Sequence, residues 1–427
     1  MIIANNHYDV IVVGGGPAGA TAATLLAQHG RRVVLLERED FPRYHVGESL
    51  LPFCYDTLNR LGLVEKLNET AFVKKYSVQF ATMDGRMSQP FYFSDHLEGH
   101  PAGQTWQVER ADFDRMMTDN ARDNGVEVRF GVSANKVIKD SAGRVTGIEA
   151  KDEHGQTIQL RAPMTIDASG RNGFASNAMG WKRKRDPELN KIALWTYYKG
   201  GKRGEGRDEG ATTVAYIPEK GWFWHIPMHD DRISLGVVGD RNYLYRDGLK
   251  DPLAVMEREI GCNDWVKDVM QGSEQFGETW VTGDYSYRSE YSATDGLVLT
   301  GDAFGFLDPV FSSGVFLALT SGQLAADTVH QALCENDPSA HRFEAYTDEF
   351  QSGIEAMRKL VYAFYTEGFS FGKLLKKHPH LRSDLTDCLI GNMSTDFTAL
   401  FDGVAEFVDV PEPLAYGRPL PVEQPAG

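Results

Sequence analysis

The hydrophobic residues near the N-terminus form short continuous runs separated by glycine-rich and alanine-rich stretches. The first run covers Tyr8–Val13 and the second covers Val33–Leu36. Continuous apolar runs are typical of parallel strands that are buried on both faces. The alanines and leucines between them predict a helix from about Pro17 to His29, which Gly30 is placed to end. This strand–helix–strand order predicts the start of an α/β fold.

Further elements follow from the spacing of apolar residues along the rest of the chain. The pattern predicts helices at residues 53–68, 111–124, 315–333 and through most of 341–408, and strands at 76–93, 126–130, 165–169, 296–300 and in several segments of 190–240. The glycine-rich and charge-rich stretch 200–210 predicts a surface loop. The proline-rich residues 411–427 are expected to follow the surface.

Composition narrows the function classes. The 427 residues are 42% hydrophobic and 24% charged, which is ordinary for a globular protein, and the net charge is −16. A negative balance argues against nonspecific binding to nucleic acid or to anionic membranes. The four cysteines have no metal-ligand or CxxC spacing, which favours a reduced, cytoplasmic setting. No signal peptide and no membrane-spanning run is predicted.

The first strand is followed directly by Gly14–Gly19, which reads GGGPAG. Glycines at these positions permit a tight turn, a close approach to pyrophosphate and close helix–strand packing. The helix N-terminus then offers free N–H groups to phosphates. Glu37 ends the second strand, where it would accept hydrogen bonds from an adenosine ribose. We interpret this unit as a dinucleotide site; the alternative is a strand–helix–strand unit that binds nothing.

The most unusual stretch is Gly221–Pro227, which reads GWFWHIP and holds two of the seven tryptophans. The tryptophans alternate, so both lie on one face of a predicted strand. Together with Gly14–Gly19, this WxWxIP pattern resembles the flavin-dependent halogenases, a branch of the flavin monooxygenase fold. In that family the motif lines the flavin and disfavours direct oxygenation of the substrate. The alternative is a pair of core aromatics in a sheet.

Several segments resemble flavin-contacting parts of that family. Val298–Ala303 is similar to its second flavin fingerprint, which implies that Asp302 accepts hydrogen bonds from the ribityl chain. Asp167–Arg171 is similar to the segment beside the adenosine half, and Arg110 to an arginine that reaches the flavin. The alternative for Arg110 is a surface residue at a helix end. No second GxGxxG unit is found, so reduced flavin is expected from a separate NAD(P)H-dependent reductase.

The resemblance also implies a halide site and a reactive lysine. Asp308–Val315 is similar to the family segment in which a hydroxyl and backbone amides hold the halide, here Ser313 and Gly314; the alternative is a serine that only caps a helix. Phe72–Phe80 is similar to the stretch with the essential lysine, and Lys75 matches while Lys74 is its neighbour. The mobile charge of lysine suits a group that holds and polarises hypohalous acid. The alternative for Lys75 is a solvated strand end.

Two positions depart from the patterns of that family. Phe311 stands where its tryptophan-acting members carry glutamate, and Ser77 stands where relatives often have glycine. The segments His45–Ser49 and Phe311–Val315 resemble instead the halogenases of pyrroles and phenols. The substrate is therefore expected to be an electron-rich ring, free or tethered to a carrier protein. A further expected contact for an acidic carrier is Leu374–Leu381 of the helical C-terminal part, with Lys376, Lys377 and His378; the alternative is a solvated helix face.

The resulting prediction is an α/β protein with a Rossmann-like FAD-binding domain, a β-rich substrate region and a helical C-terminal part. The expected bounds are 1–75, 111–185 and 291–335 for the FAD-binding parts, 76–110 and 186–290 for the substrate region, and 336–427 for the helical part. The expected site residues, by the roles that the resemblance implies, are Lys75 for catalysis; Gly14, Gly16, Pro17, Ala18, Gly19, Glu37, Arg38, Glu48, Ser49, Arg110, Asp302, Pro309, Gly314 and Val315 for FAD; Ser313 and Gly314 for the halide; and Trp222, Trp224, Ile226 and Pro227 beside the flavin; no metal is expected.

The activity that the resemblance implies is an FADH₂-dependent halogenase of secondary metabolism, such as antibiotic biosynthesis. It would make hypohalous acid from O₂ and chloride or bromide, and halogenate a pyrrole or phenol by electrophilic substitution. An aromatic hydroxylase or another flavin oxidoreductase of the same fold is the first alternative. A non-catalytic FAD-binding protein is the second, because a fold alone does not select among these functions.

Overall fold

The first hydrophobic run forms an inner strand of a seven-stranded sheet in the computed structural model, which describes residues 7–283 and 286–422. The strands lie in the order β22 (Arg418–Leu420), β19 (Tyr291–Thr294), β20 (Leu297–Leu299), β11 (Met164–Asp167), β1 (Val10–Val13), β2 (Val33–Leu36) and β7 (Glu127–Arg129). Four neighbouring pairs, from β20 to β7, are parallel. This arrangement places the predicted glycine turn at the carboxyl end of β1.

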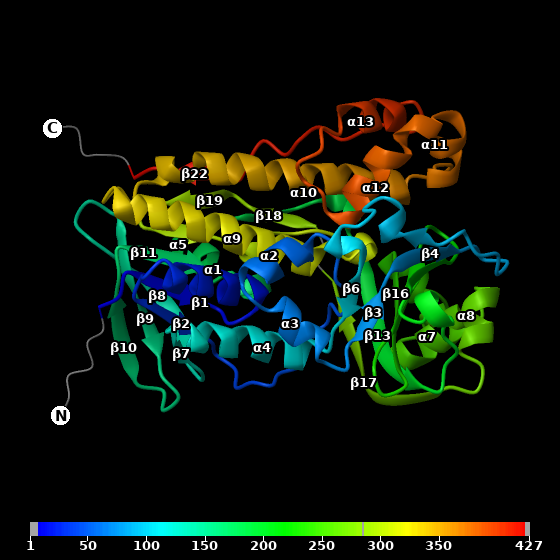
Figure 1. The fold of residues 1–427 in the computed structure, drawn as a ribbon, viewed down its shortest axis with the longest axis horizontal. Coiled ribbons are helices and arrows are strands. Elements are labelled where there is room, and N and C mark those ends of the chain that lie inside the picture. Colours follow the sequence, from blue (N-terminus) through cyan, green and yellow to red (C-terminus); the bar gives the residue numbers. More distant parts are fainter. Residues whose placement is uncertain (1–6, 284–285, 423–427) are drawn as a thin grey trace.

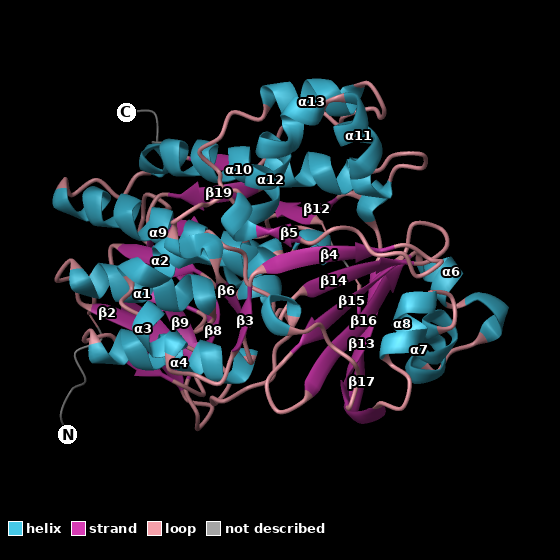
Figure 2. Cartoon of the chain, turned by 45° about the vertical axis from the view of Figure 1, so that its right-hand side comes forward, coloured by secondary structure: helices cyan, strands magenta, loops and turns pink. Residues whose placement is uncertain are grey.

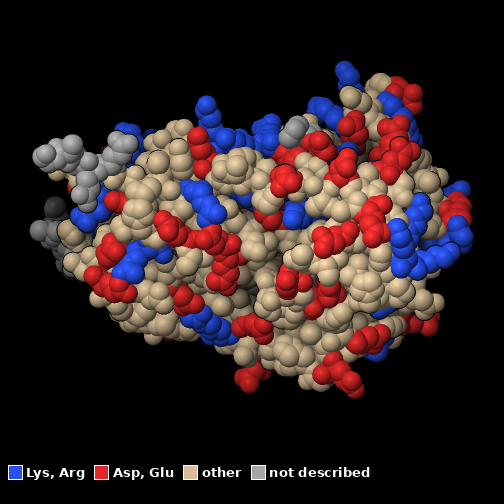
Figure 3. Space-filling model, turned by 90° about the horizontal axis from the view of Figure 1, so that it is seen from above, with Lys and Arg blue, Asp and Glu red and all other residues tan. Residues whose placement is uncertain are grey.

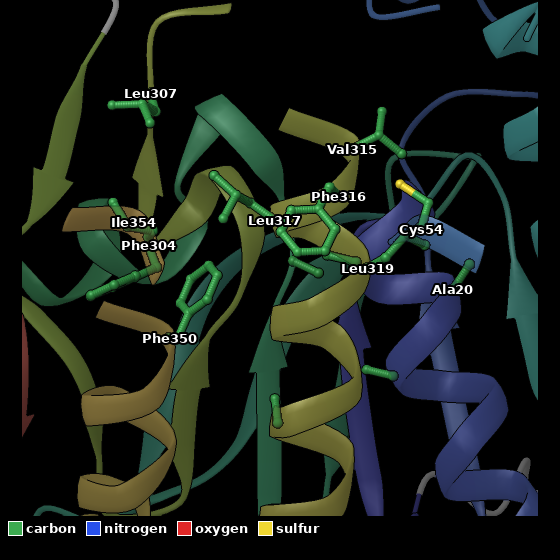
Figure 4. Close-up of a cluster of buried hydrophobic side chains, with 14 of the residues drawn as sticks. Ala20, Cys54, Phe304, Leu307, Val315, Phe316, Leu317, Leu319, Phe350 and Ile354 are labelled. Carbon is green, nitrogen blue, oxygen red and sulfur yellow. The ribbon is translucent and has the colours of Figure 1, made fainter. Parts of the chain in front are cut away.

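Long helices cover this first sheet. They are α1 (Pro17–Gln28), α4 (Arg110–Asp123), α9 (Ser313–Cys334) and α10 (Glu344–Tyr365). Figure 1 shows α9 lying between α1 and α10. Buried side chains join the three helices, among them Ala20 of α1, Phe316 of α9 and Phe350 of α10 (Figure 4). The apolar core therefore continues from the N-terminal unit into the C-terminal helices.

A second seven-stranded sheet lies beside the first (Figure 2). Its order is β17 (Glu274–Thr282), β13 (Ile192–Lys199), β16 (Arg232–Gly239), β15 (Trp222–Pro227), β14 (Thr212–Tyr216), β4 (Ser77–Ala81) and β5 (Phe91–Tyr92), and all pairs are antiparallel except β14 with β4. Side chains alternate between the two faces of β15. Phe223 therefore belongs to a smaller hydrophobic cluster, whereas its neighbours Trp222 and Trp224 belong to the main core. The two tryptophans thus share one face, as predicted.

Smaller elements complete the fold. Three small sheets contain β8 (Ser133–Lys139), β9 (Val145–Lys151) and β10 (Thr157–Arg161); β12 (Arg183–Arg185), β18 (Tyr287–Ser289) and β21 (Gly305–Phe306); and β3 (Val73–Lys75) with β6 (Thr105–Gln107). The remaining α-helices are α2 (Cys54–Arg60), α3 (Val64–Asn68), α5 (Phe174–Met179), α6 (Arg241–Leu244), α7 (Pro252–Ile260), α8 (Asp264–Val269), α11 (Phe371–Lys377), α12 (Arg382–Ile390) and α13 (Thr398–Ala405).

The predicted α/β architecture is confirmed, with two local corrections. The helix expected at 53–68 is split into α2 and α3, and the C-terminal tail contributes β22, which pairs in parallel with β19. A strand of three residues in a proline-rich tail has too short a hydrophobic pattern to be predicted. Residues 423–427 of that tail lie outside the described residues. The division into domains stays a prediction, and none of the helices within the described ranges is long and apolar enough to cross a membrane.

Candidate active site

The glycine turn after β1 lines a cavity of about 1090 Å³, which we call the large cavity. Gly14 has a φ of 108°, and a Cβ there would lie 2.3 Å from the carbonyl oxygen of Ala168. A Cβ at Gly19 would lie 1.9 Å from the oxygen of Gly14. Only glycine fits both positions, because Gly14 lies against the backbone of Ala168 and Gly19 lies against the carbonyl of Gly14. The backbone is therefore shaped to approach a bound pyrophosphate closely.

Glu37 holds this turn from the end of β2. Its Oε2 accepts a 2.9 Å hydrogen bond from the amide of Gly15, and its Oε1 accepts one of 3.0 Å from the amide of Glu39. The side chain is buried and also lines the large cavity. Arg38 lines the same cavity but is half-exposed and pairs with Glu39. Glu37 is thus fixed in place beside the expected adenosine site.

Arg110 and Asp302 lie along the same cavity. Arg110 begins α4, yet it is buried and forms a two-point ion pair with Asp114 at 2.9 and 3.0 Å. Its Nη1 donates a 2.8 Å hydrogen bond to the carbonyl of Val46 and so anchors the loop that leads to Glu48. Arg110 is therefore not a surface cap. Burial raises the pKa of Asp302 to about 6, against the lowering effect of Arg171 and Arg110.

Glu48 is a buried carboxyl in the wall of the large cavity. It accepts a 2.7 Å hydrogen bond from the hydroxyl of Tyr197 on β13, and burial raises its pKa above the ordinary value. The ring of Tyr197 contacts Trp280 and Tyr44, which stack on each other with centroids 4.3 Å apart. An aromatic cluster from β13, β17 and the loop before Glu48 therefore flanks this part of the cavity.

The WxWxIP strand supplies a further wall. Trp222, Trp224 and Ile226 line the large cavity, whereas Pro227 pairs with Ile233 at the end of β15 and does not line it. The indole ring of Trp224 lies close to Gly236 of β16, where a Cβ would come within 2.1 Å of the ring. The glycine therefore lets the ring lie against the neighbouring strand. Three residues of the predicted motif therefore line the large cavity and are at the same time part of the core.

The N-terminus of α9 reaches the large cavity through Gly314 and Val315. The hydroxyl of Ser313 is buried and has no hydrogen-bond partner in the described chain. Ser312, at the cap position, has a φ of 57° and makes no side-chain cap bond. The capping alternative is therefore wrong for both serines. A buried unpaired hydroxyl at the start of a 22-residue helix gives donors of the kind that bind anions.

Lys75 lines a second cavity of about 420 Å³, which we call the lysine cavity. The side chain is fully buried, so the alternative of a solvated strand end is wrong, while Lys74 next to it is exposed. The amine donates hydrogen bonds to the hydroxyl of Ser49 at 2.9 Å and to the carbonyl of Leu50 at 3.1 Å. Burial lowers the pKa of Lys75 to about 7. Both protonation states are thus available near neutral pH.

The two cavities adjoin. Their shared lining residues are Thr212, Val214, Val310 and Ser312. Most other residues of the lysine cavity are apolar or aromatic, including Phe93 and Phe311. At its outer end the lining includes the exposed residues His380, Arg382 and Ser383, so this cavity opens near the start of α12. The two cavities therefore share part of one wall, and the lysine cavity reaches the surface beside α12.

The structure brings most predicted site residues together. Those that line the large cavity are Gly14, Gly16, Pro17, Ala18, Glu37, Arg38, Glu48, Ser49, Arg110, Asp302, Pro309, Gly314, Val315, Trp222, Trp224 and Ile226. Gly19 packs behind the turn, and Ser313 is buried behind Gly314. Sequence reasoning missed Thr212, Gln107 and Tyr365, which contact the site from distant segments. No local pattern marks them; only their contacts in the fold reveal them.

Comparisons with known proteins agree with this geometry. The sequence model of the tryptophan halogenase family matches residues 98–369, which is more than half of the chain. The chain belongs to this halogenase family. A model of FAD dependent oxidoreductases matches residues 9–178 of the halogenase. This second match covers the glycine turn, Glu37 and Arg110.

The halogenase has relatives over nearly its whole length. It is 33% identical to a 1H-pyrrole-2-carbonyl-[peptidyl-carrier protein] brominase of Pseudoalteromonas luteoviolacea, across 90% of this chain and 92% of the relative. It is 31% identical to the corresponding chlorinase of Pseudomonas fluorescens, across 92% and 90%. The solved structure of the flavin-dependent brominase Bmp2 superposes with a TM-score of 0.84 at 31% identity, across 94% of this chain and 98% of that one.

These findings confirm several predictions. The protein is a flavin-dependent halogenase, an oxidoreductase-type enzyme that uses FAD and takes a halide as co-substrate. The hydroxylase and non-catalytic alternatives are therefore set aside. The large cavity fits FAD, because it combines a glycine turn, a carboxylate at the end of β2 and an aromatic wall. The roles of the individual site residues and the reductase partner stay predictions.

Proposed function

We propose that this halogenase acts on a pyrrole-type aromatic acyl group that is tethered to a carrier protein. The observation that carries the proposal is the buried amine of Lys75 in the wall of an apolar cavity that adjoins the large cavity and opens to the surface. A ring can enter this cavity while its acyl tether extends through the mouth beside α12. The names of two relatives specify a pyrrole-2-carbonyl group on a peptidyl carrier protein.

In this proposal the large cavity holds FAD. The glycine turn and the N-terminus of α1 bind the pyrophosphate, Glu37 the adenosine ribose and Asp302 the ribityl chain. Trp222 and Trp224 exclude water from one side. Bound reduced FAD supplies the activation of O₂ that converts halide to hypohalous acid. Because the sequence has one dinucleotide fingerprint, a separate NAD(P)H-dependent reductase delivers the reduced flavin.

The proposed halide site is the N-terminus of α9. The hydroxyl of Ser313 has no partner within the described residues, and the amide of Gly314 belongs to the first turn of the helix, where backbone donors are not used by the helix itself. A chloride or bromide ion accepts hydrogen bonds from both groups. The site adjoins the wall that separates the two cavities, since Ser312 lines both of them.

Lys75 then holds the hypohalous acid beside the ring. With a pKa of about 7, the neutral amine accepts a hydrogen bond from hypohalous acid, and the ammonium ion donates one to its oxygen and so polarises the oxygen–halogen bond. The surrounding apolar side chains exclude water, which would otherwise compete for the electrophile. Phe311 lies in the same cavity and supplies no carboxylate. An electron-rich ring suits this arrangement because it needs less assistance to lose its proton after attack.

The carrier protein is expected at the mouth of the lysine cavity. His380 and Arg382 line this mouth, and Lys376 is exposed on the neighbouring α11. Lys377 and His378 instead pair with Glu406. Figure 3 looks down on the face with the C-terminal helices, where basic and acidic side chains are interspersed. The contact is therefore a small basic rim rather than a broad basic surface.

The test is mass spectrometry of reaction mixtures with FAD, a flavin reductase, NADH, O₂ and either bromide or chloride. Three substrates are compared: pyrrole-2-carbonyl on a carrier protein, free pyrrole-2-carboxylate, and a simple phenol. We expect halogen incorporation into the carrier-bound ring and little into the free acid. Equal turnover of the free acid would overturn the tethering, and addition of oxygen in place of halogen would overturn the assigned chemistry.

A further inference from the structure

A pair of hydroxyl groups stands in the wall between the two cavities. The oxygens of Ser49 and Thr212 lie 2.8 Å apart, although the residues are 163 positions apart in the chain. Both side chains are buried, both line the large cavity, and Thr212 also lines the lysine cavity. Lys75 donates to Ser49 at 2.9 Å. We call this pair the hydroxyl bridge.

Gln107 fixes the direction of hydrogen bonding at one end of the hydroxyl bridge. Its Nε2 donates to the carbonyl of Gly210 at 2.9 Å and to Thr212 Oγ1 at 2.8 Å. A carbonyl oxygen can only accept, so the amide group facing it is the NH₂ and both of its protons are used. The hydroxyl of Thr212 therefore acts as an acceptor from Gln107. At the other end, Ser49 acts as an acceptor from Lys75.

A proton count follows from these directions. The two hydroxyls of the bridge carry two protons, and the contact between them uses one. While Lys75 is the ammonium ion, the second proton makes no hydrogen bond within residues 7–283 and 286–422. Whichever hydroxyl carries it, that residue lines the large cavity. The bridge therefore holds one spare donor in the wall of this cavity.

The same contacts orient the amine of Lys75. As the ammonium ion, the amine has three N–H groups. The hydroxyl of Ser49 and the carbonyl of Leu50 accept two of them. The third N–H group has no hydrogen-bond partner within residues 7–283 and 286–422, and Lys75 lines the lysine cavity. Loss of this third proton leaves the amine lone pair in its place.

We propose that the hydroxyl bridge aims the Lys75 amine into the lysine cavity and offers its spare proton as a hydrogen bond to the hypohalous acid that crosses the wall. Ser49 and Thr212 are thus positioning residues of the halogenation step, and this inference rests on the proposed function. Thr212 is the informative member, because it touches the bridge and both cavities without contacting the lysine.

The first experiment uses the flavin-free protein and measures Lys75 directly. Lysine is labelled with ¹³C at Cε, and the Lys75 signal is identified by its absence in Lys75→Met. We expect the signal to titrate near pH 7 in the wild type, at a pH lower by about half a unit or more in Ser49→Ala, and unchanged in Thr212→Val. The Ser49 change lowers the midpoint because the ammonium form loses an acceptor.

The second experiment measures halogenated product per FADH₂ consumed, together with released peroxide. Thr212→Val removes the hydroxyl and keeps the shape, and we expect the yield to fall about tenfold, since one hydrogen bond made in the reacting state has roughly that effect. Thr212→Ser keeps the hydroxyl and stays within about twofold on the same argument. Ser77→Ala is the matched control, because it removes a buried hydroxyl near Lys75 that is bonded to Asp208 instead.

The outcomes are distinct. A normal yield in Thr212→Val, or the same loss in Ser77→Ala, overturns the bridge as a donor. An unshifted Lys75 titration in Ser49→Ala overturns its role in holding the amine. If the wild type halogenates no tested ring, the proposed function fails while the titration result still stands. If Ser49→Ala does not fold, Ser49→Thr and the two Thr212 variants decide the question.

Discussion

The indole N–H of Trp222 donates a 2.8 Å hydrogen bond to the hydroxyl of Tyr365, although the two residues are 143 positions apart. Tyr365 in turn donates to Asp308 Oδ2 at 3.0 Å. Asp308 also accepts from the amide of Val310 at 3.0 Å and so shapes the turn that leads into α9. One tyrosine of α10 therefore joins the WxWxIP strand to the segment that carries the proposed halide site.

Replacing Tyr365 with phenylalanine is expected to destabilise the protein by about 1–3 kcal/mol, because the buried Trp222 N–H and the Asp308 carboxylate both lose a partner. Burial raises the pKa of Asp308 to about 6, and the hydroxyl of Tyr365 counteracts that rise. Loss of the Tyr365 hydroxyl therefore destabilises the ionised carboxylate of Asp308 and not its protonated form. The destabilisation should be larger at pH 8 than at pH 5, as measured by urea unfolding.

Tyr346→Phe is the control for this prediction. Tyr346 lies on the same helix and donates to the uncharged carbonyl of Leu299 at 2.6 Å. Its loss should cost a similar free energy of unfolding with no change between pH 5 and pH 8. Equal pH dependence in the two variants would contradict the link between Tyr365 and ionised Asp308.

Lys75→Met should abolish halogenation while reduced FAD is still oxidised and hydrogen peroxide is released. The reason is that methionine fills the space but cannot bind hypohalous acid. Lys74→Met, on the exposed neighbour, should retain activity. Halogenated product and hydrogen peroxide are measured in the same samples of each variant. Activity lost in Lys74→Met and kept in Lys75→Met would show that the register of the motif is shifted by one residue.

Lys75→Met should also stabilise the folded protein at low pH. The pKa of Lys75 falls from 10.5 to about 7 on folding. The unfolded chain therefore binds the proton more tightly, and this penalty grows as the pH falls from about 10.5 towards 7 and is complete below 7. Calorimetry should show that Lys75→Met raises the unfolding temperature by a few degrees, roughly, at pH 6 and by less at pH 9. A gain that increases with pH would contradict the depressed pKa.

Gly236→Ala should disturb the aromatic wall of the large cavity. The new Cβ would lie 2.1 Å from the ring of Trp224, which must move, so we expect a loss of about 1–3 kcal/mol in stability and weaker FAD binding. Gly239→Ala on the same strand is the matched control, since its nearest neighbour is a Leu244 carbon at 3.3 Å. Fluorescence titration with FAD compares the two. Equal affinities would show that Trp224 does not shape the cofactor site.

Arg382→Glu should weaken the carrier-bound reaction selectively. The residue is exposed at the mouth of the lysine cavity, so reversing its charge should raise KM for the carrier-bound ring about three- to tenfold and leave kcat nearly unchanged. Lys151→Glu, exposed on β9 far from this mouth, should have no effect (Figure 1). An equal rise in KM for a small free phenol would place Arg382 in the ring site rather than at the carrier contact.

Free tryptophan should be halogenated at least about a hundredfold more slowly than a tethered pyrrole. Phe311 lines the lysine cavity at the position where the tryptophan-acting relatives carry glutamate, so no carboxylate from this segment assists proton loss. Competition between the two substrates under one FADH₂ supply measures the ratio. Efficient halogenation of tryptophan at a single ring position would assign proton removal to another acid, and Asp95 at the cavity lining would be the next residue to replace.

The N-terminal unit was predictable because its signals are local. The apolar runs of β1 and β2, the glycines between them and Glu37 lie within one short stretch, and each has a direct structural reason. The tryptophans of β15 were placed on one face by alternation alone. The resemblance identified Lys75, but its complete burial and its bond to Ser49 depend on β3, β6 and the loop before α2.

The contacts that complete the site could not be predicted in the same way. Ser49 meets Thr212 across 163 residues, and Trp222 meets Tyr365 across 143. Neither Thr212 nor Tyr365 differs by type or spacing from ordinary residues of a strand and a helix. Their importance follows from where the tertiary fold places them, and hydrophobic periodicity contains no information on such pairs.

The position of Tyr365 also bears on the synthesis of the protein. Trp222 and Asp308 are synthesised before α10, and neither has this hydroxyl until that helix has been made and has docked. The glycine turn, Glu37 and Arg110 come from the first third of the chain and do not depend on it. A product truncated before α10 therefore lacks the residue that ties Asp308, at the turn into α9, to Trp222.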